Sequence, residues 1–176
     1  MTKILQHACL ALASVIAISE LQADNLNDLF GEGILDTTWG MSVAEVQSIY
    51  PDGETVEAIG KTYSVTNGKT ILKQERKKKH RLDFQFDTTG RLYAIRIQFS
   101  DSSFVKLNEV LEGFLGRVDY DPMKQDILSG MNVKTWENGE IKIRSFVAMS
   151  GLFGSSTFLE VTKIPSSAPS KDDLGL

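Results

Sequence analysis

Residues 81–99, with the sequence RLDFQFDTTGRLYAIRIQF, decide the expected fold because they contain two strands joined by a turn. Apolar and polar residues alternate on both sides of the turn at residues 87–90, which is the pattern of strands with one buried face. The residues expected on that face are Leu82, Phe84, Phe86, Tyr93, Ile95, Ile97 and Phe99. The stretch therefore predicts a half-buried antiparallel hairpin.

Further strands are expected on both sides of this hairpin. Residues 61–65 and 69–77 flank Asn67-Gly68, a dipeptide that favours a two-residue hairpin turn. Toward the C-terminus, residues 132–137 and 140–148 flank Asn138-Gly139, and residues 156–164 follow a loop at 150–155. The sequence thus predicts a second antiparallel group of strands.

Two helices are expected, one before each group of strands. Ser42 and Glu45 have the spacing of a capping box, which predicts a helix over residues 42–50 that ends at Pro51. A second helix is expected from Ser102 or Ser103 to Leu115, with Gly116 following its C-terminus. Its expected apolar stripe comprises Phe104, Leu107, Leu111 and Phe114.

The order helix, meander, helix, meander predicts an α+β fold, with a mainly antiparallel sheet and two helices packed on one face. Residues 37–164 would form this single domain. Residues 24–36 form an N-terminal lead in which Leu26, Leu29 and Phe30 are available to dock. Residues 165–176 are rich in serine, proline and charge, which is typical of a disordered tail.

The first 23 residues have the pattern of a secretory signal peptide. Lys3 precedes an apolar stretch at residues 8–18, and small residues follow at positions suited to cleavage. Cleavage is expected after Ala23, with Ser19 as the alternative, and the apolar stretch is too short to span a membrane. Lipid attachment at Cys9 is disfavoured by the polar residues before it. A periplasmic or secreted location in a bacterial envelope is expected.

The composition of the remaining chain restricts its chemistry. Without residues 1–23 the protein has no cysteine and one histidine, His80, which disfavours thiol catalysis and a zinc site of histidines and thiolates. No catalytic or cofactor motif is found, so no catalytic residue, metal or cofactor is expected. Asp119 and Asp121 lack calcium-loop spacing, and the net charge of −4 argues against general nucleic-acid binding.

A basic run at residues 76–81 is the strongest charge feature. It suggests a patch that binds an anionic envelope component or an acidic protein. The alternative is a solvated hairpin end that lysines keep soluble, with His80 as a solvated residue. The candidate binding residues in the run are Arg76, Lys77, Lys78, Lys79 and Arg81.

The loop at residues 149–155 is the second candidate for binding. Leu152 and Phe153 lie at its centre between glycines, where a turn between strands is usually polar. An apolar tip of this kind would enter a partner or a lipid surface. The alternative is a loop that folds over the core. Trp39 and Trp136 are expected to be core anchors.

Two segments resemble parts of small exported bacterial α/β proteins of mostly unknown function. One is Trp39-Gly40-Met41-Ser42, which leads into a helix containing Glu45 and Val46 and then Tyr50-Pro51. The other has the pattern Gly-x-Leu-x-x-Ile and begins at Gly90. The resemblance implies an α+β fold and an envelope location, and it implies no activity because such scaffolds carry different functions.

We therefore expect an exported, non-catalytic binding protein: an inhibitor, an accessory of envelope assembly or an immunity-type protein. Its partner would be a protein or an anionic envelope component. The alternatives are a carboxylate-based hydrolase, which would show converging carboxylates in a cleft, and a small-ligand carrier, which would show a closed apolar cavity.

Overall fold

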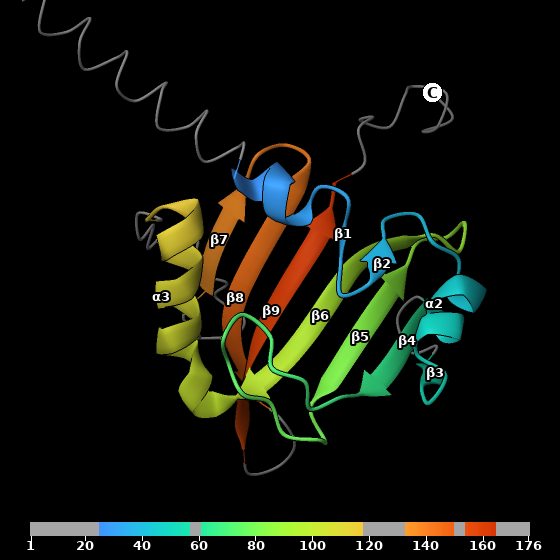
Figure 1. The fold of residues 1–176 in the computed structure, drawn as a ribbon, viewed down its shortest axis with the longest axis horizontal. Coiled ribbons are helices and arrows are strands. Elements are labelled where there is room, and N and C mark those ends of the chain that lie inside the picture. The colour runs from blue at the N-terminus through green and yellow to red at the C-terminus, as the bar shows by residue number, and fades with distance from the viewer. Residues whose placement is uncertain (1–24, 57–60, 118–132, 150–153, 165–176) are drawn as a thin grey trace, which may run out of the picture.

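A seven-stranded antiparallel sheet forms the body of the computed structural model, which describes residues 25–56, 61–117, 133–149 and 154–164 (Figure 1). The strand order is β3-β4-β5-β6-β9-β8-β7. The strands are β3 (Glu54–Val56), β4 (Lys61–Thr66), β5 (Arg81–Phe86), β6 (Leu92–Ser100), β7 (Val133–Glu137), β8 (Ile141–Met149) and β9 (Ser155–Lys163). A separate small hairpin joins β1 (Gly33–Ile34) to β2 (Thr37–Thr38). The mixed α and β content and the mainly antiparallel sheet are as the sequence predicts.

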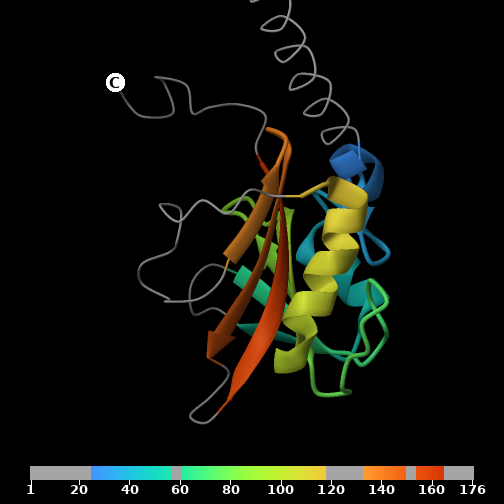
Figure 2. The same cartoon turned by 90° about the vertical axis from the view of Figure 1, so that its left-hand side faces the viewer.

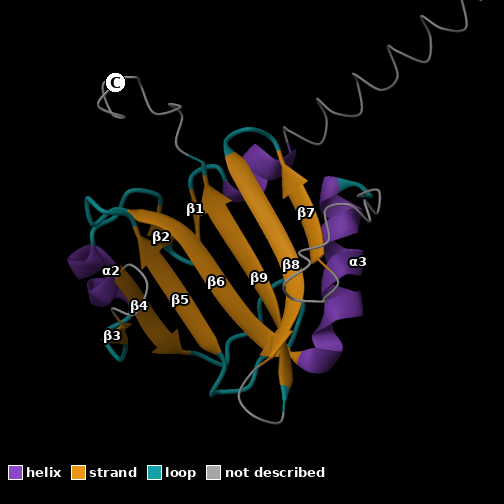
Figure 3. Cartoon of the chain, turned by 180° about the vertical axis from the view of Figure 1, so that it is seen from behind, coloured by secondary structure: helices purple, strands orange, loops and turns teal. Residues whose placement is uncertain are grey.

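Two meanders meet at the centre of this sheet. Strands β3 to β6 form the first, strands β7 to β9 form the second, and β6 pairs with β9 from Ala94–Thr162 to Ser100–Ser156. Figure 2 shows α2 (Val43–Ile49), α3 (Phe104–Leu115) and the helical residues 25–30 on the same side of the sheet. Figure 3 shows the opposite side, which we call the outer face.

The predicted hairpin at residues 81–99 is confirmed as β5 and β6, with one correction. The register shifts where Gln85 pairs with Ala94 and Phe86 pairs with Leu92, so Tyr93 is the extra residue of a β-bulge. Leu92 is consequently buried, and Tyr93 is exposed with its hydroxyl 3.3 Å from Gln85 Oε1. The prediction that Tyr93 shares the buried face was wrong.

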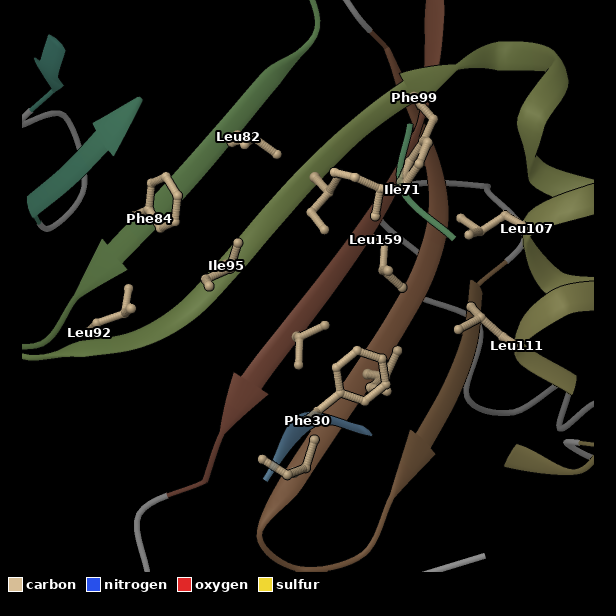
Figure 4. Packing of buried hydrophobic residues seen from close by; sticks show 14 of the residues in the cluster. Phe30, Ile71, Leu82, Phe84, Leu92, Ile95, Phe99, Leu107, Leu111 and Leu159 are labelled. Carbon is tan, nitrogen blue, oxygen red and sulfur yellow. The ribbon is translucent and has the colours of Figure 1, made fainter. Parts of the chain in front are cut away.

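The hairpin predicted at Asn67-Gly68 was also wrong. Strand β4 pairs with β5, and residues 67–80 form the long connection between them. Asn67 Oδ1 accepts the Lys69 N–H at 2.7 Å, which turns the chain out of the sheet. The chain then reverses between Ile71 and Gln74, which exchange two backbone hydrogen bonds. Burial of the Ile71 side chain in the core keeps this connection against the molecule (Figure 4).

The first helix follows the sequence closely, and the second differs at one position. In α2, Ser42 Oγ accepts the Glu45 N–H and the Glu45 carboxylate accepts the Ser42 N–H, so the capping box is confirmed. A 3-10 turn, η1 (Asp101–Ser103), precedes α3. The buried residues of α3 are Leu107, Asn108, Leu111 and Leu115. Phe114, predicted in the stripe, is 48% exposed because the four-residue spacing of the leucines puts it at the margin.

One hydrophobic cluster joins both meanders and the helices. Figure 4 shows Phe30, Leu159, Leu107 and Leu111 converging from different elements. Leu26 and Phe30 dock into this cluster as predicted, whereas Leu29 is exposed. Trp136 is buried, with Nε1 donating to Gly116 O at 3.1 Å. Trp39 is partly buried against the cluster and donates to Phe30 O at 2.7 Å. No helix among the described residues is long and apolar enough to cross a membrane.

Candidate anion-binding site

Arg76, the first residue of the basic run, is 7% exposed and bonds to the backbone. Its Nε donates to Gln98 O at 2.8 Å, and its Nη2 donates to the carbonyls of His80 and Arg81 at 3.2 and 2.9 Å. The guanidinium carbon lies 5.8 Å from the centroid of the Phe99 ring. Burial lowers the pKa of Arg76 to about 10, so the side chain stays charged at neutral pH. Arg76, which the sequence suggested as a candidate binding residue, is thus buried and ties the run to β6.

Arg81, the last residue of the run, is also engaged within the fold. It begins β5, and its guanidinium lies 3.0 Å from Asp83 Oδ1 and donates to Ser64 Oγ at 2.6 Å. Ser64 and Asp83 are partners in the pairing of β4 with β5, and the Ser64 hydroxyl donates to Asp83 Oδ1 at 2.5 Å. The Arg81 charge is therefore balanced on the sheet.

Lys77 and Lys79 line a pocket of about 440 Å³ at the end of the sheet, and we call it the basic pocket. His80 lies beside them, and Gln98, Ser100 and Asp101 contribute from the end of β6 and the turn after it. Residues 154–156, at the start of β9, complete the lining. Lys78 is exposed and is not among the lining residues, although it lies between the two lysines in sequence.

Hydrogen bonds fix the walls of the basic pocket. The Lys77 N–H donates to His80 Nδ1 at 3.1 Å, and the His80 N–H donates to Lys77 O at 2.9 Å. Gln98 Oε1 accepts the Arg81 N–H at 3.1 Å, while Gln98 Nε2 donates to Ser156 Oγ at 2.9 Å. These bonds join residues 77–81 to both central strands of the sheet.

His80 is buried, so the prediction of a solvated strand-end residue was wrong. Burial lowers the pKa of His80, and the positive charges of Arg76, Lys77 and Lys79 lower it further. The imidazole is therefore neutral at pH 7. Because its Nδ1 accepts the Lys77 N–H, the single ring proton belongs on Nε2. His80 thus carries an uncharged N–H donor and lines the same pocket as Lys77 and Lys79.

The structure brings together the two regions that the sequence singled out. Leu152 and Phe153 lie outside the described residues, but Gly154 and Ser155, which follow them, line the basic pocket with Lys77 and Lys79. The lining residues outside both of these regions, which sequence reasoning missed, are Gln98, Ser100, Asp101 and Ser156. They meet because β6 pairs with β9, and no local pattern signals that pairing.

A second cluster of charged and aromatic residues lies on the outer face. Arg96 Nη2 and Glu160 Oε2 are 2.5 Å apart, and Arg144 Nη1 lies 3.7 Å from the other oxygen of Glu160. Phe146 and Phe158 stack at 5.6 Å, and the guanidinium carbons of Arg96 and Arg144 lie 6.0 and 5.5 Å from the Phe146 centroid. These cross-strand contacts reinforce the centre of the sheet.

The described residues contain no group of three or more histidine, cysteine, aspartate and glutamate side chains placed to hold a metal ion. The Asp119 and Asp121 pair lies outside the described residues. Asp101 is the acidic side chain that lines the basic pocket.

No protein-family model and no curated protein matches the chain. Among solved structures, it is similar to the crystal structure of a DUF4309 family protein, YjgB, from Bacillus subtilis, at 10% sequence identity and a TM-score of 0.48. The match covers 84% of this chain and 97% of that one.

Proposed function

We propose that this chain is an exported, non-catalytic binding protein that holds an anionic group of its partner in the basic pocket. The observation that carries this proposal is the convergence of Lys77 and Lys79 with hydroxyl and amide groups of β6 and β9. Two ammonium groups on a polar concave surface attract anions, and the surrounding donors can bond an oxyanion directly.

The residues that line the basic pocket favour a binding protein over the two alternatives, a carboxylate-based hydrolase and a small-ligand carrier. A carboxylate-based hydrolase needs a second acidic group near the first, whereas Asp101 has lysines and serines as its neighbours in the pocket. A carrier of an apolar ligand needs an apolar cavity, whereas polar residues and Gly154 line this one. The partner is a protein or an anionic envelope component, and the protein acts on it as an inhibitor, an assembly accessory or an immunity-type protein.

The location belongs to the same proposal. Residues 1–23 have the signal-peptide pattern, so the binding protein would reach the periplasm or the cell exterior. An anion-binding domain there would meet acidic proteins and the anionic polymers of the envelope.

The test compares two double variants that remove the same charge from the same segment. Lys77→Ser with Lys79→Ser empties the basic pocket of ammonium groups, and Lys69→Ser with Lys78→Ser removes two exposed lysines that do not line it. Binding to immobilised polyphosphate, an acidic polysaccharide and an acidic polypeptide is measured across a salt series.

We expect the pocket variant to bind at least one of these probes about tenfold more weakly, corresponding to about 1.4 kcal/mol. The matched control should stay within about twofold, because screened charges outside the pocket contribute little. If both double variants bound the probes equally weakly, binding would depend on general charge attraction and not on the basic pocket, which would contradict the proposal. Thermal unfolding of both variants verifies that they fold.

A further inference from the structure

The cations of the basic pocket are lysines, although two arginines flank them in sequence. Arg76 donates to three backbone carbonyls, and Arg81 pairs with Asp83 and Ser64, so neither guanidinium is directed to the pocket. The guanidinium fork of arginine matches carboxylate and phosphate alike, whereas lysine is a compact point charge that binds an oxyanion without a fixed planar geometry. The pocket therefore offers two point charges, and the placement of its other donors decides which oxyanion it favours.

The donors reach the pocket from three elements. The segment before β5 gives the two ammonium groups and the His80 N–H, the end of β6 gives Ser100, and the start of β9 gives Ser155 and Ser156. A phosphate monoester presents three terminal oxygens in three dimensions and carries about −1.5 to −2 charges at pH 7. Two ammonium groups balance that charge, and donors on several sides match the three oxygens better than a two-oxygen carboxylate.

The size and lining of the basic pocket indicate what the ligand carries besides its phosphate group. A volume of about 440 Å³ lies in the range of small-molecule sites and exceeds what a single oxyanion fills. Apart from the imidazole of His80, the described lining residues are charged, polar or glycine, so they offer an acyl chain no apolar surface. Asp101 accepts the Ser102 N–H at 2.8 Å and has capacity to accept a ligand hydroxyl as well.

From these three observations we infer that the ligand of the basic pocket is the phosphate ester of a polyol, such as a glycerol or sugar phosphate. Lys77, Lys79 and His80 hold the phosphate, and Asp101 accepts a hydroxyl of the polyol. This inference rests on the proposed function and narrows the anionic group to one chemical class.

Calorimetric titration at constant ionic strength tests the inference with four probes: glycerol 3-phosphate, glycerophosphoglycerol, inorganic phosphate and glycerate. Glycerate is a carboxylate of the same carbon skeleton with one negative charge, so it controls for the hydroxyl groups and matches the charge of the diester glycerophosphoglycerol. We expect at least one phosphate ester to bind about tenfold more tightly than glycerate. The two esters distinguish the sources, because the first represents a free or terminal phosphate and the second a phosphate within a polymer or lipid headgroup.

Two variants assign the contacts. Lys79→Ser should weaken the bound ester about tenfold, while Lys78→Ser stays within about twofold. Asp101→Asn should reduce the preference for glycerol 3-phosphate over inorganic phosphate, because the amide accepts a hydroxyl proton less strongly than a carboxylate does.

Glycerate binding as tightly as the esters would overturn the inference, and so would an Asp101→Asn variant with an unchanged preference. The two proposals fail separately. If polyanions still depend on Lys77 and Lys79 while no ester binds, the ligand class is wrong and the binding function stands. If no anionic probe depends on these lysines, both are wrong.

Discussion

At the scale of single residues, Arg76 fixes the position of the basic run at residues 76–81. Its guanidinium joins the backbone of His80 and Arg81 to Gln98 in β6, so the intervening lysines are held at the sheet end. Arg76→Met fills similar space but leaves these carbonyls without their donor. We expect a loss of about 1–3 kcal/mol in the free energy of unfolding, measured by urea titration.

The neighbouring exposed Lys78 provides the control for Arg76. Lys78→Met changes the same charge in the same run, and surface changes usually stay within about 0.5 kcal/mol. Equal stability of the two variants would show that the buried guanidinium contributes nothing to the fold.

His80 gives the fold a pH dependence whose sign follows from its burial. Its pKa is lowered from 6.5 by burial and by Arg76, Lys77 and Lys79, so below pH 6.5 the unfolded chain binds more protons at this site than the folded chain does. The free energy of unfolding should therefore fall as the pH drops from about 6.5 toward the folded pKa, and His80 should contribute no slope above that range.

His80→Asn isolates this contribution. The Asn side-chain oxygen replaces Nδ1 as the acceptor of the Lys77 N–H, but the amide does not titrate. Urea unfolding between pH 5 and 8 should show a smaller slope below pH 6.5 in this variant. An unchanged slope would assign the pH dependence to groups other than His80.

At the scale of elements, α3 attaches to the sheet by a narrow apolar stripe. Leu111 is buried at the centre of this stripe, whereas Phe114, one turn later, is 48% exposed. Leu111→Ala should therefore cost about 2–5 kcal/mol in unfolding free energy, because it removes packing and leaves a cavity. Phe114→Ala should stay near 0.5 kcal/mol. A larger loss from Phe114→Ala would mean that this ring is covered in solution.

The elements that the sequence predicts well are those fixed by neighbouring residues. The capping box can be recognised from the three-residue spacing of Ser42 and Glu45 alone. The alternation at residues 81–86 can likewise be recognised within a single strand. The bulge at Tyr93 depends on how β6 meets β5, and no pattern within β6 signals it. At Asn67-Gly68 the local sequence predicts a hairpin turn, but the chain leaves the sheet there instead. The burial of Ile71 in the core, which no local pattern signals, favours this path.

At the scale of the whole molecule, the pairing of β6 with β9 creates the candidate site. Ser100 pairs with Ser156, which places the end of the first meander beside the start of the last strand. The sequence predicts the basic run and the nearby loop separately. It does not show which lysines face a pocket, because that depends on the Arg76 contacts and on a strand pairing between distant segments.

Export acts on the whole chain and is tested by mass. If residues 1–23 are a signal peptide, protein purified from its native host should have the intact mass of a chain that begins at Asp24. A mass that begins at Glu20 would indicate the alternative cleavage after Ser19. A full-length mass, or a lipid adduct on Cys9, would contradict the proposed export.

The continuous sheet and its single core imply that both meanders unfold together. Trp39 lies near the first meander and Trp136 lies in β7 of the second, so the two tryptophans report on opposite halves. In Trp39→Phe the fluorescence follows Trp136, and in Trp136→Phe it follows Trp39. Each variant should show the same urea midpoint by fluorescence and by far-ultraviolet circular dichroism, as two-state unfolding requires. Comparing probes within one variant removes the stability cost of each substitution. Separate midpoints in either variant would show that the β6–β9 pairing joins two independently folding halves.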